Sequence, residues 1–248
     1  MSENLCYTDA LARSVEARVV AVEPPAAEGS GAQVVLDRTV FYPGGGGQPP
    51  DRGLLRTADG RSWAVASARK AGDDVIHELA PGVEPPAAGT AVTAELDWER
   101  RYALMRTHTA LHTLCGVVWR DFHAQVTGGN MEPGSGRMDF EFETMSADLV
   151  GTIEERVNAE LTAARDVLVR SLPRAEAHAI PDLIRTKINL LPEGITEIRT
   201  IEIVGLDLQA DGGTHVSNTR EVGTIRVTGY ESKGRINKRI RLELVAPA

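Results

Sequence analysis

The chain has 248 residues, 42% of them hydrophobic and 25% charged, with a formal net charge of −8 at pH 7, so it can build one large or two modest domains. The acidic balance argues against a protein that coats nucleic acid without specificity, because that affinity depends on Lys and Arg neutralising phosphates. Two cysteines, Cys6 and Cys115, form no disulfide framework, and no long apolar run or signal-peptide pattern is seen, so we expect a cytoplasmic protein without a membrane partner.

Short β-branched runs separated by turn residues fill residues 16–97. Stretches such as 23–25 and 84–86, each Glu-Pro-Pro, interrupt them. The pattern predicts a small β-barrel or sandwich with hairpin connections, which we assign to a domain of residues 1–96. The expected strands are Val19–Val22, Val34–Leu36, Trp63–Ala66, Val75–Leu79 and Val92–Leu96.

The hydrophobic period changes near residue 97. Asp97 has the chemistry of an N-cap, and buried-type residues then recur at steps of three and four, which predicts a long helix over 98–122. A second helix is expected over 146–170, and strand-like runs follow at 197–208, 222–230 and 235–245. We therefore expect an α+β fold, in which residues 97–248 form a second domain with long helices packed on an antiparallel sheet.

Two histidines lie four residues apart inside the first predicted helix. His108 and His112 project from one helical face about one turn apart and could together bind one metal ion. A metalloprotease would read His-Glu-x-x-His, but here Thr109, Ala110 and Leu111 intervene, which disfavours protease chemistry. The alternative is that the two histidines simply line a buried face.

A second chemical motif reads Asp211-Gly-Gly-Thr-His215 and lies between two predicted strands. Its paired glycines allow a tight turn that could aim Asp211 and His215 at one point, although a plain hairpin turn is the alternative. Three histidines and one aspartate would make a tetrahedral zinc site, or three of the four could bind while water takes the remaining position.

Several separate motifs together resemble one family. The segments His-Thr-Ala-Leu-His at 108–112 and Gly-Gly-Thr-His at 212–215 are similar to the editing domain of alanyl-tRNA synthetase and its freestanding AlaX-type relatives. Residues 41–49, Phe-Tyr-Pro-Gly-Gly-Gly-Gly-Gln-Pro, resemble the glycine-rich motif of the family's N-terminal β-barrel, and residues 137–140 match another recurrent element. The resemblance covers residues 8–245 and implies a zinc-dependent deacylase that hydrolyses the ester of a mischarged tRNA.

The resemblance also implies a set of site residues. His108, His112, Asp211 and His215 would hold the Zn²⁺ and carry catalysis, although Asp211 stands where the family generally has Cys, so that it is either a metal ligand or a residue that orients a water or a histidine. The remaining candidates are Gly45, Gly46, Gly47, Gln48, Thr127 and Asn130 for the substrate, and Lys233, Arg235, Lys238 and Arg239 for tRNA phosphates.

The bound metal would activate a water or polarise the ester carbonyl, and the spacing indicates no Ser-His-Asp or Cys-His nucleophile. The expected substrate is tRNA(Ala) carrying Ser or Gly. An alternative is a tRNA carrying a threonine-like, non-proteinogenic amino acid such as fluorothreonine. Two further alternatives are a tRNA-binding module without catalysis and a metal-dependent hydrolase of a small ester or amide. The sequence does not indicate an oligomeric state.

Overall fold

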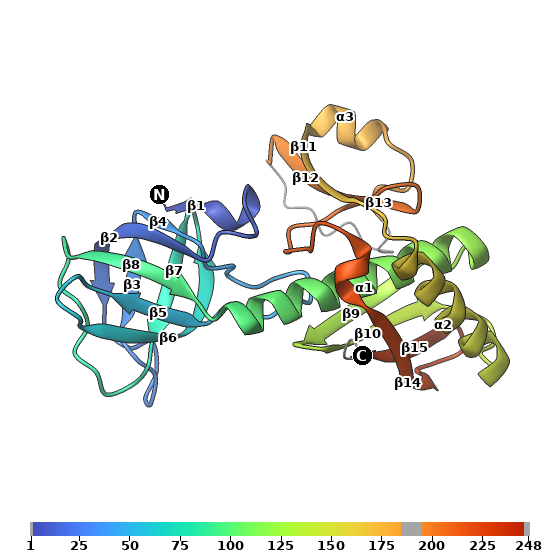
Figure 1. Ribbon diagram of the computed structural model, residues 1–248, viewed down its shortest axis with the longest axis horizontal. Coiled ribbons are helices and arrows are strands. Elements are labelled where there is room, and N and C mark those ends of the chain that lie inside the picture. Colours follow the sequence, from blue (N-terminus) through green and yellow to red (C-terminus); the bar gives the residue numbers. More distant parts are fainter. Residues whose placement is uncertain (1, 185–194, 246–248) are drawn as a thin grey trace. The chain divides into compact units, whose positions relative to one another are not determined.

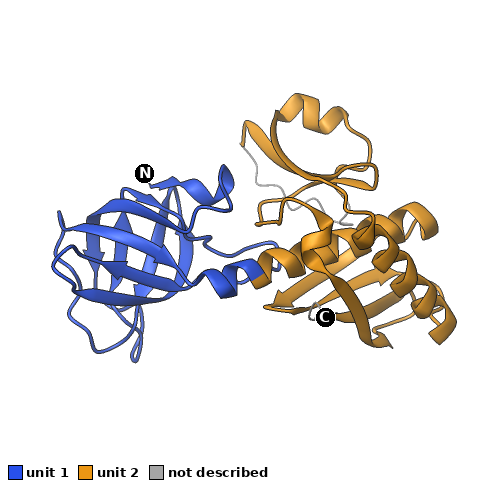
Figure 2. Ribbon diagram, in the orientation of Figure 1, with its two compact units in different colours: residues 1–102 blue, residues 103–248 orange. Residues whose placement is uncertain are grey.

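The computed structural model describes residues 2–184 and 195–245, and it divides into two compact units, Met1–Tyr102 and Ala103–Ala248 (Figure 2). The domain boundary that we expect from the sequence, between residues 96 and 97, stays a prediction. Among the described residues, no helix is both long and apolar enough to cross a membrane.

Unit 1 is built on a closed barrel of antiparallel strands in the order β2-β3-β7-β6-β5-β8 (Figure 1), which confirms the predicted barrel. Burial alternates along β6, as expected for a strand with one face toward a core. Register shifts in β2 and β6 mark bulges, and bulges let such long strands bend around the barrel. The barrel strands are β2 (Ser14–Glu23), β3 (Gln33–Leu36), β5 (Gly53–Arg56), β6 (Ser62–Ala71), β7 (Asp74–Leu79) and β8 (Ala91–Leu96).

A short parallel pair, β1 (Glu3–Asn4) and β4 (Arg38–Thr39), and the 3-10 turn η1 (Leu5–Tyr7) complete this unit. Its core contains Leu36, Leu55 and Leu79, none of which is exposed to solvent. Burying side chains of this size contributes about 1.5–3 kcal/mol each.

Helix α1 (Trp98–Phe122) matches the predicted helix, and Asp97 caps it by accepting a hydrogen bond from Arg100 N at 3.1 Å. It ends where His123 adopts a φ of 53°. In unit 2 it packs on a four-stranded antiparallel sheet of order β14-β15-β10-β9, where Leu111 lies against Gly136. The strands are β9 (Val126–Glu132), β10 (Ser135–Glu141), β14 (Thr224–Ser232) and β15 (Asn237–Val245).

Helix α2 (Ala147–Thr162) lies along the edge strand β14. The Asn158 side chain donates to Ile225 O at 3.0 Å and accepts from Ile225 N at 2.8 Å, so one amide satisfies both backbone groups of a residue at the sheet edge. The 3-10 turn η2 (Thr219–Val222) leads into β14 and begins with a capping box formed by Asn218 and Glu221.

A second, three-stranded sheet of order β11-β12-β13 carries the short helix α3 (Arg174–Ala179). Its strands are β11 (Val167–Pro173), β12 (Glu197–Ile203) and β13 (Asp207–Ala210). The turn between β12 and β13 contains Gly205 with a φ of 74°, a conformation that favours glycine. This hairpin delivers the chain to residue 211.

Three expectations about unit 2 were wrong in detail. The second helix ends at Thr162 instead of continuing to residue 170, because Ala164 turns to a φ of 53° and residues from Val167 onward pair with β12. The run 197–208 is a hairpin instead of one strand. The single predicted sheet is two sheets, and its strands β9 and β10 were not predicted. Strand β5 of unit 1 was not predicted either.

Candidate metal centre

Helix α1 presents His108 and His112 on one side, with ring centroids 4.9 Å apart. The two are 4% and 7% exposed, so both imidazoles are buried. The segment between them carries Thr109 and Ala110, which are themselves fully buried, so the helix is enclosed on several sides at this turn. A rigid, enclosed helix fixes the direction of both rings.

The second pair of side chains comes from the segment that follows β13. Asp211 Oδ2 accepts a hydrogen bond from Gly213 N at 2.6 Å, which closes a tight turn. This turn brings His215 back to the same carboxylate, with His215 Nε2 3.2 Å from Asp211 Oδ2. The Asp-Gly-Gly-Thr-His motif therefore aims two potential ligands at one point.

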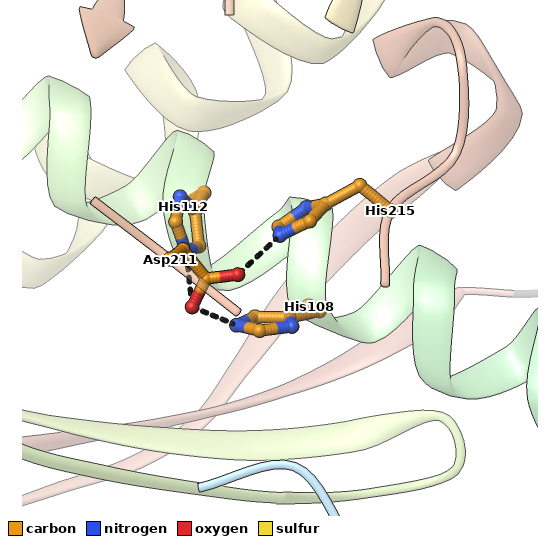
Figure 3. A group of neighbouring side chains, drawn as sticks. All are labelled: His108, His112, Asp211 and His215. Carbon is orange, nitrogen blue, oxygen red and sulfur yellow. Dashed lines mark hydrogen bonds and ion pairs between the residues drawn. The ribbon is translucent and has the colours of Figure 1, made fainter. Parts of the chain in front are cut away.

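The four side chains meet in one buried cluster (Figure 3). Asp211 Oδ1 lies 3.7 Å from His108 Nε2 and 3.9 Å from His112 Nε2. One potential ligand atom from each of the four residues lies within 4.8 Å of those of the others. Three imidazoles and a carboxylate, converging from two distant segments, form a group that could hold a metal ion.

Thr109 supports the ring of His215 from the other side. The Thr109 hydroxyl lies 3.1 Å from His215 Nδ1 and also accepts from Val216 N at 3.3 Å. When Nδ1–H donates to this hydroxyl, Nε2 keeps its lone pair toward the cluster, which is the tautomer that binds metal. Sequence analysis did not single out Thr109, although its place between the two helix histidines was the available signal.

The cluster holds its groups in the protonation states that a metal requires. Burial lowers the pKa of His108 well below its usual value, against the attraction of Asp211, and burial lowers the pKa of His215 to about 4. Burial alone would raise the pKa of Asp211, but the neighbouring histidines, His108 first, hold it well below its usual value. At neutral pH the cluster therefore contains an ionised carboxylate and at least two neutral imidazoles.

His112 provides the most direct indication that these residues fit a metal. Its Nδ1 is buried and has no hydrogen-bond partner among the described residues, and its Nε2 faces Asp211 Oδ1 at a distance too long for a hydrogen bond. Buried polar groups are nearly always satisfied. A metal ion bound at Nε2 would give that nitrogen the partner that Asp211 is too distant to supply, although Nδ1 would stay unpaired among the described residues.

The glycine-rich motif forms an ordered turn in unit 1. Gly45 and Gln48 exchange backbone hydrogen bonds of 3.0 and 2.9 Å, and the Tyr42 hydroxyl donates to Gly45 O at 3.0 Å. Gly45, Gly46 and Gly47 have φ values of 132°, 58° and 86°. A residue with a side chain would be strained in this backbone conformation, so glycine is favoured. The turn accounts for these glycines, and the substrate role expected for them and for Gln48 stays a prediction.

Thr127 and Asn130 are exposed residues of β9 and are not part of the buried cluster. The Thr127 hydroxyl donates to the Asn237 carboxamide at 2.9 Å. Asn130 pairs with Arg137, one position from the Met131–Gly136 pair that faces α1, so Asn130 lies on the opposite sheet face. Their part in substrate recognition stays a prediction.

The basic run near the C-terminus spreads over two environments. Lys238 is 6% exposed, and its amine donates to Gly234 O at 2.9 Å and to Arg235 O at 2.8 Å. Arg239 forms two bonds to the Asp139 carboxylate, of 2.7 and 2.8 Å. Lys233 and Arg235 are exposed at the turn between β14 and β15. The expected phosphate contacts stay a prediction, and the exposed Lys233 and Arg235 are better placed for them than Lys238 and Arg239.

Two family models match the chain. Residues 3–100 match class II (A) tRNA synthetases, and residues 198–241 match the second additional domain of threonyl- and alanyl-tRNA synthetases. The second match contains the Asp211 and His215 ligand candidates, and the first contains the glycine-rich turn.

Several relatives of similar length share one name. The alanyl-tRNA editing proteins AlaX-M of Methanosarcina mazei and Methanosarcina acetivorans are 34% and 36% identical to this chain, over 100% and 99% of it and over 98% and 100% of the relatives. An alanine–tRNA ligase of Pyrobaculum neutrophilum is 36% identical over 93% of the chain, which matches 25% of the ligase. The chain therefore belongs to the family of freestanding alanyl-tRNA editing proteins, which is related to the editing domain of alanyl-tRNA synthetase.

Proposed function

We propose that this protein is a trans-acting, metal-dependent deacylase that hydrolyses the ester of a mischarged tRNA, of the Ser-tRNA(Ala) or Gly-tRNA(Ala) type. The observation that carries the proposal is the buried cluster of three histidines and one aspartate in a chain whose full-length relatives are alanyl-tRNA editing proteins. The partner that the protein would bind is the acceptor end of a tRNA that carries the wrong amino acid.

His108, His112 and His215 would hold the metal through their ε nitrogens, and Asp211 Oδ1 would be the fourth ligand atom. When bound, a divalent ion of this kind polarises an ester carbonyl or lowers the pKa of a water molecule toward neutrality. Oδ1 is the favoured ligand atom because Oδ2 already accepts from Gly213 N and lies beside His215. This choice makes Asp211 a metal ligand instead of a residue that only orients a neighbour.

The chain's own groups contribute orientation and charge. Thr109 holds the His215 ring, and the Gly213 amide holds one oxygen of the carboxylate, so neither ligand has to be ordered when substrate arrives. The depressed pKa values of His108 and His215 keep both imidazoles unprotonated at neutral pH, so no proton has to leave them before a metal binds.

The test is deacylation of tRNAs charged with Ser, Gly, Ala and Thr, with the metal content of the enzyme assayed in parallel. The wild type should release Ser or Gly, and His108→Ala should lose both the metal and the release. His178→Ala is the matched control because His178 is an exposed histidine outside the cluster. Binding of the tRNAs without any release by metal-loaded wild type would contradict the proposal and favour a binding module.

A further inference from the structure

Arg199 on β12 faces the residue that begins the second ligand motif. The β12–β13 ladder ends with the pair Thr200 and Ala210, and the next residue, Asp211, continues it by donating its backbone N–H to Arg199 O at 3.1 Å. The backbone of Asp211 is therefore tied to the sheet on its amide side by the position occupied by Arg199.

The side chain of the same residue binds the other backbone group. Arg199 Nη1 donates to Asp211 O at 3.0 Å, so Arg199 contacts Asp211 on both its amide and its carbonyl side. The carboxylate is restrained separately, by the bond of 2.6 Å from Gly213 N to Oδ2. These three bonds leave Oδ1 as the oxygen that faces His108 and His112.

The carboxylate of Asp211 benefits from a backbone that is held in place, because its own side chain is flexible. The Asp side chain reaches its oxygens through two rotatable bonds, and its backbone lies at the end of a short strand in a turn. Fixing a residue's backbone costs conformational entropy, and ordering its side chain adds to this cost. A loop that is held in place before the metal arrives does not incur that cost on binding.

Arg199 also brings a positive charge to the cluster. Its charge opposes protonation of His108 and His215, but it contributes less than burial and the neighbouring cluster side chains.

We propose that Arg199 is a positioning residue for the metal centre: it holds the backbone of Asp211 on both sides so that the carboxylate is presented to the three histidines. The inference rests on the proposed function for the identity of the ligands. It adds a role for Arg199, a residue that lies outside both sequence motifs. Arg199 reaches Asp211 only because the fold places β12 beside it.

The test compares Arg199→Gln and Arg199→Lys with the wild type and with Arg170→Gln. Arg170 is the matched control because it lies on the neighbouring strand β11 with a side chain that is 62% exposed. The first readout is amide hydrogen exchange of residues 211–215 in metal-free protein. The second readout is zinc affinity, measured by competition with a chelator in the absence of tRNA.

Arg199→Gln should speed amide exchange in residues 211–215 and weaken zinc binding roughly 10–100-fold, the usual effect of removing a group that orients a metal ligand. Arg199→Lys keeps the charge and one donor type and should recover part of both losses, whereas Arg170→Gln should change neither. Unchanged exchange and unchanged zinc affinity in Arg199→Gln would overturn the proposal. Faster exchange in Arg199→Gln, together with a wild type that binds no zinc, would support Arg199 as the residue that holds the backbone of Asp211. The same result would overturn the metal in the proposed function.

Discussion

Gly116→Ala should weaken the metal centre without touching a ligand. Gly116 lies one helical turn after His112 on α1, and a Cβ added there would be 2.8 Å from Asp207 Cβ and 3.0 Å from Leu206 Cγ. Ordinary contact begins at 3.4 Å, so the β12–β13 hairpin or the helix must move by at least about 0.6 Å. Because the hairpin carries Asp211, this movement shifts one ligand relative to the two histidines on α1.

Two opposing effects determine how Gly116→Ala changes the free energy of unfolding. Overpacking costs typically 1–3 kcal/mol, whereas replacing Gly by Ala inside a helix contributes about 1 kcal/mol of stability, so the net loss should be at most about 2 kcal/mol. Zinc affinity should fall by roughly 10–100-fold, because ligand geometry tolerates only small displacements. Urea denaturation measures the first quantity, and competition with a chelator measures the second.

Gly151→Ala on α2 is the matched control, because no heavy atom lies within 4 Å of the added Cβ. It should stabilise the protein by roughly 0.5–1 kcal/mol and leave zinc affinity unchanged. If Gly116→Ala gained the same stability and bound zinc like the wild type, the close approach of hairpin and helix would not determine ligand position, and the reasoning would be refuted.

Two further changes test the surroundings of the ligands and of the barrel core. Thr109→Val removes the hydroxyl beside His215 and should reduce zinc affinity about 10-fold, whereas Thr109→Ser should retain it; equal affinity in both variants would contradict the tautomer argument. His77 is buried, with its pKa lowered from 6.5 to about 4, so the unfolded chain binds its proton more readily and stability is lost as pH falls from 6.5 toward 4. Urea denaturation at pH 7 and pH 5 should show about 2 kcal/mol more loss in wild type than in His77→Gln, and an identical loss would contradict the assignment.

The parts of the fold that local patterns determine could be predicted. Alternating β-branched runs gave the barrel, and the Asp97 cap with a regular apolar stripe gave α1. The run 163–170 was misassigned because Ala164 and Leu168 continue the helical stripe that includes Leu161, while Val167 and Val169 also suit a strand. These residues form a strand because they pair with β12, about thirty residues farther along the chain. Local periodicity carries no information about that partner.

The four metal-ligand candidates could be predicted from motif spacing, and the structure brings them together as a potential metal site. The residues that hold them could not be predicted, because the contacts of Arg199 and Gly116 depend on strand register and on how closely a hairpin approaches a helix. The basic run shows the same limit. Alternate residues of β15 point to opposite sheet faces, which buries Lys238, whereas Arg235 lies in the preceding turn and is exposed.

The central claim is that the cluster holds one metal ion that hydrolysis of mischarged tRNA requires. The most direct test is to remove metal from the wild type and follow release of Ser from Ser-tRNA(Ala) while zinc is added back stepwise. We predict negligible release without zinc, a linear rise to a plateau at one zinc per chain, and no recovery in His108→Ala at the same zinc concentrations. Full release by metal-free wild type, or equal recovery in His108→Ala, would contradict the claim.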